Sequence, residues 1–159
     1  MWLAKDWKDY EIIDSSRGMK LERWKDVYLL RPDPQIVWDN GDLLEKYHSK
    51  INAVYYRSNK GGGHWENLKS LPDNWKIEYH DLVFNIKQMG FKHTGLFPEQ
   101  AVNWDWMINK IKSSGRKDVK VLNLFAYTGG ATVACSYAGA SVCHVDSSKG
   151  MVAWAKENV

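Results

Sequence analysis

Residues 120–146 read KVLNLFAYTGGATVACSYAGASVCHVD, and this stretch decides the fold. It begins with a nearly continuous apolar run at residues 120–126, which is typical of a strand buried on both faces of a parallel sheet. A turn at Gly129 and Gly130 follows, and the next apolar residues fall on one helical stripe. A second strand is expected at residues 142–145, and it ends at Asp146. The order strand, glycine turn, helix, strand, acid predicts one βαβ unit.

A helix is predicted on each side of this unit. Residues 98–99, proline and glutamate, suit a first helical turn, where a missing N–H group costs nothing and a negative charge meets the dipole. Apolar residues then recur at helical spacing as far as residue 111, and Gly115 ends the pattern. The serines at residues 147–148 can cap the last helix. Three tryptophans at periodic positions are expected in the core: Trp75, Trp104 and Trp154.

Up to about residue 95 the chain reads as β structure. Residues 75–79 and 82–86 both alternate apolar with polar, and only two residues separate them, so they predict a hairpin. Pro32 and Pro34 are expected to stop an earlier strand, because proline cannot donate a ladder hydrogen bond. The other strands are expected at residues 10–13, 21–24, 27–30 and 53–56.

The predicted fold class is therefore α+β. A small, mainly antiparallel β domain is expected over residues 1–95. The first βαβ unit of a Rossmann-like domain, left incomplete, is expected over residues 96–159.

Composition narrows the class of protein. The 159 residues are 44% hydrophobic and 13% aromatic, which excludes an intrinsically disordered chain. The net charge of +3 is too small to establish a nucleic-acid partner. The chain has no apolar run long enough for a membrane span and no signal-peptide order at its start, so we expect no membrane partner and a cytoplasmic location. The two cysteines and five scattered histidines match no zinc pattern, so no metal site is expected.

The turn after the first buried strand is the expected ligand site. Ligands of open parallel sheets bind outside the carboxyl ends of the strands, where helix N-termini favour anionic groups. Asp146 ends the second strand 17 residues after Gly129 and can accept the hydroxyl protons of a ribose. A dinucleotide needs Gly-x-Gly-x-x-Gly for its pyrophosphate, whereas this turn carries Phe125 and Tyr127. S-adenosyl-L-methionine (SAM), which has no phosphate, suits the turn better.

The residues 123–129, Asn-Leu-Phe-Ala-Tyr-Thr-Gly, carry a family resemblance. The chain resembles class I SAM-dependent methyltransferases, and most of all the group that contains the bacterial large-subunit ribosomal RNA cytosine methyltransferases. Residues 90–100 are similar to the segment before the first strand of that family, which normally ends in Asp-Gln-Arg. Here it reads Glu99-Gln100-Ala101, so the role of the arginine does not carry over. The resemblance covers nearly the whole chain.

The resemblance implies a role for each candidate site residue. Asp146 would bind the ribose hydroxyls, and Ser147 would lie near the adenine. Gln100, with Lys92 and Thr94, would close over the cofactor. The acceptor implied is a base of ribosomal RNA. The residues implied to surround the methionine moiety, largely through their backbone, are Phe125, Ala126, Tyr127, Thr128 and Gly129.

The chain also lacks parts of the family pattern. The catalytic motif has adjacent prolines, and no two prolines are adjacent here, so the catalytic residues are unknown. Cys135 lies on a predicted core stripe and Cys143 in a strand, so neither is expected to act as the thiolate nucleophile. We expect an N-terminal fragment that is inactive alone. Its sheet edge beside residues 121–125 would be disordered or covered by another copy, as in a homodimer.

Two other functions remain open. The chain could be an RNA- or protein-binding module without catalysis, or a fragment of a nucleotide-dependent oxidoreductase. The segment Lys60-Gly61-Gly62-Gly63-His64 could follow RNA phosphates, or it could be a plain flexible hairpin.

Overall fold

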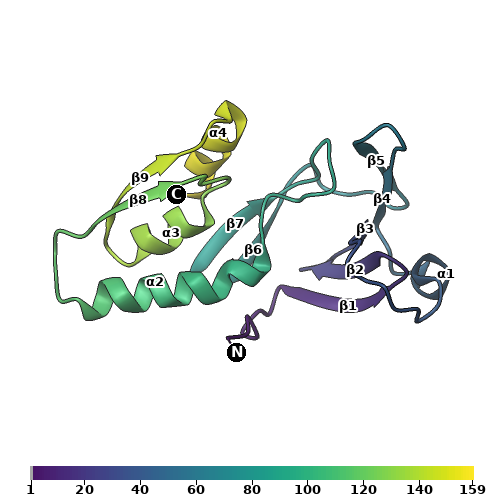
Figure 1. Cartoon of the computed structure of the whole chain (residues 1–159), viewed down its shortest axis with the longest axis horizontal. Coiled ribbons are helices and arrows are strands. Elements are labelled where there is room, and N and C mark those ends of the chain that lie inside the picture. Colours follow the sequence, from purple (N-terminus) through teal and green to yellow (C-terminus); the bar gives the residue numbers. More distant parts are fainter. Residues whose placement is uncertain (1) are drawn as a thin grey trace. The chain divides into compact units, whose positions relative to one another are not determined.

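The computed structural model describes residues 2–159, which form two compact units (Figure 1). The first, here called the β unit, comprises Trp7–Ile77 and Ile86–Thr94. The second, the α/β unit, comprises residues 2–6, Glu78–Asn85 and Gly95–Val159. The domain division after residue 95 stays a prediction, and residues 78–85 pack with the later part of the chain.

A five-stranded sheet forms the β unit (Figure 1). Its strands lie in sequence order, with every neighbouring pair antiparallel except β3 and β4. That parallel pair needs a crossover connection, which contains the short helix α1 (Leu43–Tyr47). The mainly antiparallel sheet predicted for this part is confirmed. The strands are β1 (Tyr10–Ser16), β2 (Met19–Trp24), β3 (Val27–Pro32), β4 (Ala53–Arg57) and β5 (Gly63–Asn67).

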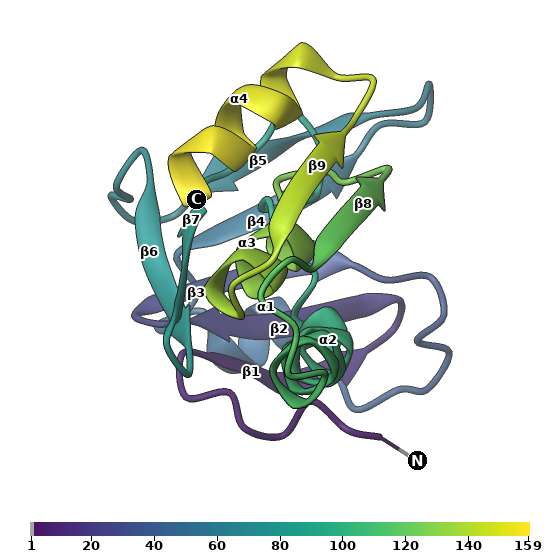
Figure 2. The same cartoon turned by 90° about the vertical axis from the view of Figure 1, so that its left-hand side faces the viewer.

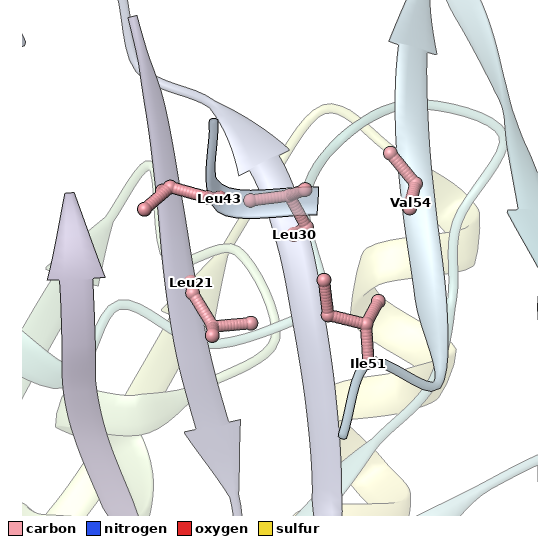
Figure 3. Packing of buried hydrophobic residues seen from close by; sticks show 5 residues of the cluster. All are labelled: Leu21, Leu30, Leu43, Ile51 and Val54. Carbon is pink, nitrogen blue, oxygen red and sulfur yellow. The ribbon is translucent and has the colours of Figure 1, made fainter. Parts of the chain in front are cut away.

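Helix α1 and the sheet enclose a hydrophobic core (Figure 3). Asp42 begins the helix, because its side chain accepts hydrogen bonds from two backbone N–H groups of the first turn. A helix of five residues is not stable alone, so its packed leucine holds it in place. The core residues are Leu21, Leu30, Leu43, Ile51 and Val54.

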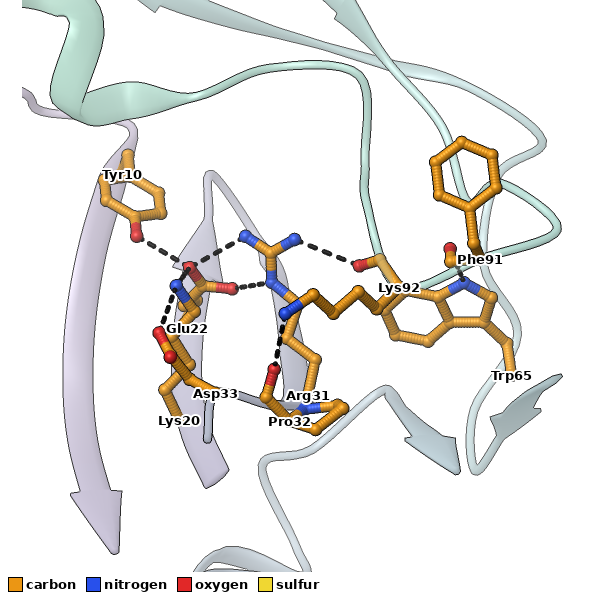
Figure 4. A network of polar contacts seen from close by, with 9 residues as sticks. All are labelled: Tyr10, Lys20, Glu22, Arg31, Pro32, Asp33, Trp65, Phe91 and Lys92. Carbon is orange, nitrogen blue, oxygen red and sulfur yellow. Dashed lines mark hydrogen bonds and ion pairs between the residues drawn. The ribbon is translucent and has the colours of Figure 1, made fainter. Parts of the chain in front are cut away.

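A buried ion pair joins β2 to β3 in the same unit (Figure 4). Glu22 is fully buried, and its carboxylate accepts hydrogen bonds from Arg31 Nε and, at 2.9 Å, from Arg31 Nη2. The Tyr10 hydroxyl donates to it at 2.7 Å, and Lys20 Nζ lies 3.4 Å from it. Burial raises the pKa of Glu22, but the charge and hydrogen bonds of Arg31, together with Lys20 and the Tyr10 hydroxyl, outweigh burial and lower that pKa. The carboxylate is therefore ionised.

The predicted hairpin is present as β6 (Trp75–Tyr79) and β7 (Leu82–Ile86). Its turn has only two residues, and His80 takes the left-handed conformation, with φ of 50°, that such a tight turn requires. Alternation places one set of side chains in the interior: Ile77, Tyr79, Leu82, Phe84 and Ile86.

The α/β unit contains the predicted strand–helix–strand order (Figure 2). Strands β8 (Lys120–Leu124) and β9 (Ser141–Val145) are parallel and lie side by side, joined through α3 (Gly130–Tyr137). The remaining elements are the 3₁₀ turn η1 (Pro98–Gln100) and the helices α2 (Ala101–Ser113) and α4 (Lys149–Asn158).

Aromatic side chains fill the interior of the α/β unit. Trp104 of α2 is buried, and its ring centroid lies 4.9 Å from that of Phe84 and 5.9 Å from that of Tyr79. Trp154 of α4 is also buried, and its indole N–H donates to a backbone carbonyl of β7 at 3.0 Å. The core positions predicted for these two tryptophans are confirmed, whereas Trp75 is only half-buried.

Strand β8 corrects the prediction of a run buried on both faces. The strand ends at Leu124, and half-buried and exposed residues alternate along it. Leu122 is 63% exposed and Leu124 is 53% exposed. The other face meets α3, where Asn123 Nδ2 donates to Thr132 Oγ1 at 2.9 Å. Within residues 2–159 no element covers the face of Leu122, and β8 pairs with β9 alone.

Three smaller features differ from the sequence expectation. Strand β3 was predicted over residues 27–30 but continues to Pro32, which lies opposite Met19, so the strand ends at the first proline and not before it. Helix α1 and strand β5 were not expected.

Across residues 2–159 every helix is too short or too polar to traverse a bilayer.

Candidate functional site

The β8–α3 loop (residues 125–129) has a backbone that is rare for its residues. Phe125 and Tyr127 have φ of 53° and 52°, and Gly129 has φ of 90°. The left-handed region costs a residue with a side chain about 1–2 kcal/mol, so the surroundings must hold it there. Ala126 N–H donates to Val145 O at 3.0 Å, which places the start of the loop at the end of β9.

Asp146, directly after β9, holds the loop with its carboxylate. Asp146 Oδ2 accepts the Tyr127 N–H at 2.8 Å, and Asp146 Oδ1 accepts the Ser148 N–H at 2.9 Å. The backbone hydrogen bond from Ser148, and then that from Tyr127, lower the pKa of Asp146. The carboxylate is therefore ionised at neutral pH. It is partly exposed, and its unused lone pairs can accept hydroxyl protons.

Thr128 anchors the centre of the loop to the interior. Its hydroxyl donates to Gly95 O, and its own carbonyl accepts Asn158 Nδ2 at 2.8 Å. The side chain is fully buried. At Gly129 a Cβ atom would lie 3.1 Å from the Cβ of Ala155, so the loop packs tightly against α4. These contacts preorganise the loop.

A polar chain beneath the loop was missed from the sequence. Asn123 Nδ2 donates to Thr132 Oγ1, and His144 Nδ1 lies 2.9 Å from that hydroxyl. Within the described chain, the buried His144 Nε2 has no hydrogen-bond partner. His144 shares the loop's surroundings, since a Cβ on Gly129 would lie 3.6 Å from its Cε1. No sequence signal indicated this group, because residues 120–126 read as one apolar run buried on both faces, which does not single out Asn123.

Gln100 connects to the loop through an aromatic contact. Its backbone N–H donates to Phe97 O at 3.0 Å, and the rings of Phe97 and Tyr127 lie 5.3 Å apart. The exposed Gln100 side chain accepts a hydrogen bond from Asn103 Nδ2 at 2.9 Å. Its role in closing over a cofactor stays a prediction.

The other predicted site residues differ in exposure. Phe125 is 93% exposed, Ser147 is exposed and Ala126 is buried. Lys92 and Thr94 belong to the β unit. The structure thus brings residues 126–129 and Asp146 together, while the ligand contacts of every predicted residue stay predictions.

The two cysteines lie in contrasting surroundings. Cys135 is buried on α3, and burial raises the pKa of its thiol. Cys143 lies on the exposed face of β9. A buried thiol with a raised pKa is a poor nucleophile at neutral pH.

One group of potential metal ligands was not expected. Atoms of Asp6, His80 and Asp105 lie within 4.8 Å of one another in the α/β unit. The Tyr79 hydroxyl already donates to Asp105 at 2.6 Å, and Asp6 and His80 are exposed. We assign no role to this group.

Comparison with curated proteins identifies partial relatives, although no family model matches the chain. The chain is similar to the ribosomal RNA large subunit methyltransferase K/L of Shewanella frigidimarina, with 34% identity over 100 residues, 62% of this chain and 13% of that protein. Identity to the protein of the same name from Shewanella sp. strain ANA-3 is 40% over 114 residues, 69% of this chain and 15% of that protein. The chain therefore spans a small part of the curated relatives it matches.

Solved structures match over nearly the whole chain. The SAM-dependent methyltransferase from Agrobacterium tumefaciens is 37% identical with a TM-score of 0.87, over 96% of this chain and 48% of that one. A Streptococcus mutans protein named as a candidate SAM-dependent methyltransferase has a TM-score of 0.69 and 18% identity, over 97% of this chain and 43% of that one. The second match shows the fold alone. The predicted resemblance to SAM-dependent methyltransferases is confirmed over part of their length.

Proposed function

We propose that this chain is the cofactor-binding part of a SAM-dependent methyltransferase that acts on RNA. Asp146 binds the ribose hydroxyls of SAM, and the backbone of the β8–α3 loop surrounds the methionine moiety. Ser147 lies beside the adenine, and Gln100 closes over the cofactor. Bound SAM supplies a methyl group that is attached to a positively charged sulfur. The acceptor base takes up this methyl group.

The hydrogen bond from Tyr127 N–H to Asp146 carries this proposal. It sets an ionised carboxylate beside a preorganised loop at the carboxyl ends of two parallel strands, where ligands of open α/β sheets bind. Hydrogen bonds to a charged group are worth about 1.5–3 kcal/mol each, so two ribose hydroxyls would gain substantial affinity there. The identity of 37% with the Agrobacterium methyltransferase supports the same cofactor.

The RNA acceptor is supported by the names of the curated relatives, which are ribosomal RNA methyltransferases. The base and the atom that receive the methyl group are left undefined by the chain. The absence of adjacent prolines, the family's catalytic signature, leads us to expect SAM binding without methyl transfer by residues 1–159 alone.

We also infer that the α/β unit is the first part of a Rossmann-like domain, preceded by a β domain. The chain spans 48% of the Agrobacterium protein. The face that exposes Leu122, Leu124 and Val145 is the place where further elements would pack. A second copy at the free edge of β8 is the alternative. Sedimentation velocity of the chain separates the two, because a homodimer would sediment with twice the mass.

Titration of the chain with SAM in a calorimeter tests the function. We expect saturable binding, and a loss of at least tenfold in affinity for Asp146→Ala, because the charged acceptor of the ribose is removed. Asp146→Asn keeps one acceptor oxygen and the side-chain shape, so its loss should be smaller.

Asp118→Ala is the matched control, since Asp118 is an exposed acid of the same unit whose ion pair with Arg116 lies at the surface. Circular dichroism checks that the variants remain folded. Absence of SAM binding, or equal binding by Asp146→Ala, rejects the proposal. Comparable binding of NADH would favour an oxidoreductase fragment, and RNA binding without SAM binding would favour a module without catalysis.

A further inference from the structure

The loop of residues 87–94 in the β unit is fixed by donors from the sheet (Figure 4). Arg31 Nη1 donates to Lys92 O at 3.0 Å. Trp65 Nε1 donates to Met89 O at 3.1 Å and to Phe91 O at 3.3 Å. All three loop acceptors are backbone carbonyls, so these bonds hold the loop without using its side chains.

Positive charge gathers on this loop without matching negative charge. The carboxylates nearby are already engaged: Glu22 pairs with Arg31, and Asp33 lies 3.3 Å from Lys20 Nζ. Among the described residues, neither Lys92 nor the exposed Arg57 at the end of β4 forms an ion pair with a carboxylate. Lys92 Nζ donates to a carbonyl instead, Pro32 O at 3.2 Å.

The electrostatic effects agree with this excess. Burial lowers the pKa of Lys92, and the charges of Arg57, Arg31 and Lys20 lower it further, against the opposing effect of Asp33. Burial and the same kind of cationic neighbours lower the pKa of His93. Cations that repel one another in this way are stabilised by an external anion.

The same loop also carries an exposed aromatic ring. Phe91 is 44% exposed, and its ring lies edge-on to that of His93 with centroids 5.6 Å apart. A fixed loop that carries both an exposed ring and a positive side chain matches the way proteins bind single-stranded nucleic acid, with bases on aromatic faces and phosphates on cations. An acidic protein segment would use the cations but would gain little from an exposed ring.

We propose that Arg57, Phe91, Lys92 and His93 form a contact surface for single-stranded RNA. Arg57 and Lys92 meet phosphates, and the Phe91 ring stacks on a base. This inference rests on the proposed RNA substrate and names the surface that would hold it. It does not depend on the SAM site.

The test is fluorescence anisotropy of a labelled single-stranded RNA oligonucleotide titrated with the full chain at several salt concentrations. We expect Arg57→Gln/Lys92→Gln to weaken binding and to reduce the slope of log affinity against log salt by about 1.4, or about 0.7 for each phosphate that is no longer neutralised. Phe91→Leu keeps an apolar side chain but loses the stacking face, and we expect a loss of roughly tenfold with the salt slope unchanged.

Two variants of the β unit are controls. Lys25→Gln removes an exposed positive charge at the other end of β2 from Lys20. Tyr56→Leu removes an exposed ring of β4 that lies opposite His64 of β5. His64 is next to Trp65 in β5, so Tyr56 lies on the other face of the sheet from Trp65. Both should bind RNA like the unaltered chain, and thermal unfolding should show that all variants are folded.

The surface is refuted if the unaltered chain does not bind RNA at protein concentrations up to about 10⁻⁴ M, the weak limit of non-specific binding. Equal binding by the surface variants and the controls also overturns it, as does tighter binding of a polyglutamate peptide that Phe91→Leu leaves unchanged. SAM calorimetry on the same samples keeps the two proposals separate. Normal SAM binding, with RNA binding that the surface variants do not change, rejects only the surface. Absent SAM binding, with RNA binding that the surface variants weaken, rejects only the transferase.

Discussion

Replacing Glu22 by alanine should destabilise the β unit strongly. The change removes the carboxylate that pairs with the guanidinium of the buried Arg31, whose Nη1 also donates to Lys92 O. Breaking a buried ion pair by removing one partner costs about 3–5 kcal/mol. Whole domains are stable by only about 5–15 kcal/mol, so this one change removes a large share.

Replacing both partners should be far less costly. In Glu22→Met/Arg31→Met no buried charge is left unpaired, and apolar side chains of similar volume fill the space. We expect the double variant to lie within about 1 kcal/mol of the unaltered chain, because buried pairs and well-packed apolar replacements are often nearly equal in free energy.

Urea unfolding followed by circular dichroism measures both changes. With a slope of about 2 kcal/mol per molar urea, a loss of about 4 kcal/mol moves the midpoint down by about 2 M. A shift of the midpoint by less than about 0.5 M for Glu22→Ala would refute the reasoning, since the loss of stability would then be no larger than for an exposed ion pair. A double variant as unstable as the single one would also refute it, because the cost would then lie in packing and not in the unpaired charge.

Three further outcomes are expected. Gly95→Ala should unfold at lower urea, because φ is +97° and the new Cβ would overlap the Trp154 ring. Acid should destabilise the chain, because the pKa of Glu22 is lowered on folding. The stability that this gives is present above the unfolded pKa of about 4.3 and is lost as the pH falls through the folded pKa. Urea midpoints measured at neutral pH and at pH 3 check this. Cys143 should react with a disulfide reagent much faster than the buried Cys135, and two equal rates in a thiol assay would contradict the burial seen here.

Periodicity predicted the elements whose side chains alternate or recur strongly. The hairpin of β6 and β7 and the strand–helix–strand order of the α/β unit follow from such patterns. Helix α1 was not predicted, because five residues are too few to show a helical period. Its stability comes from the Asp42 cap and from Leu43 in the core. Strand β5 was not predicted, because it begins at Gly63 and is a strand only through its pairing with β4.

The site was predicted in position but not in detail. The end of a buried strand beside a glycine turn indicated Asp146, and the structure sets its carboxylate against that turn. The left-handed conformations of Phe125 and Tyr127 could not be predicted, because bulky residues avoid that region unless tertiary contacts hold them. The exposure of Leu122 depends on which elements cover the sheet, which a single strand's sequence does not encode.

The α/β unit is assembled from separate stretches of the gene, with β-unit residues encoded between them. Tyr79 and Phe84, which pack on Trp104, lie upstream of the loop that carries Phe91. Recombination at residue 95 would therefore not transfer a self-sufficient cassette, because the exported half would leave its aromatic partners behind.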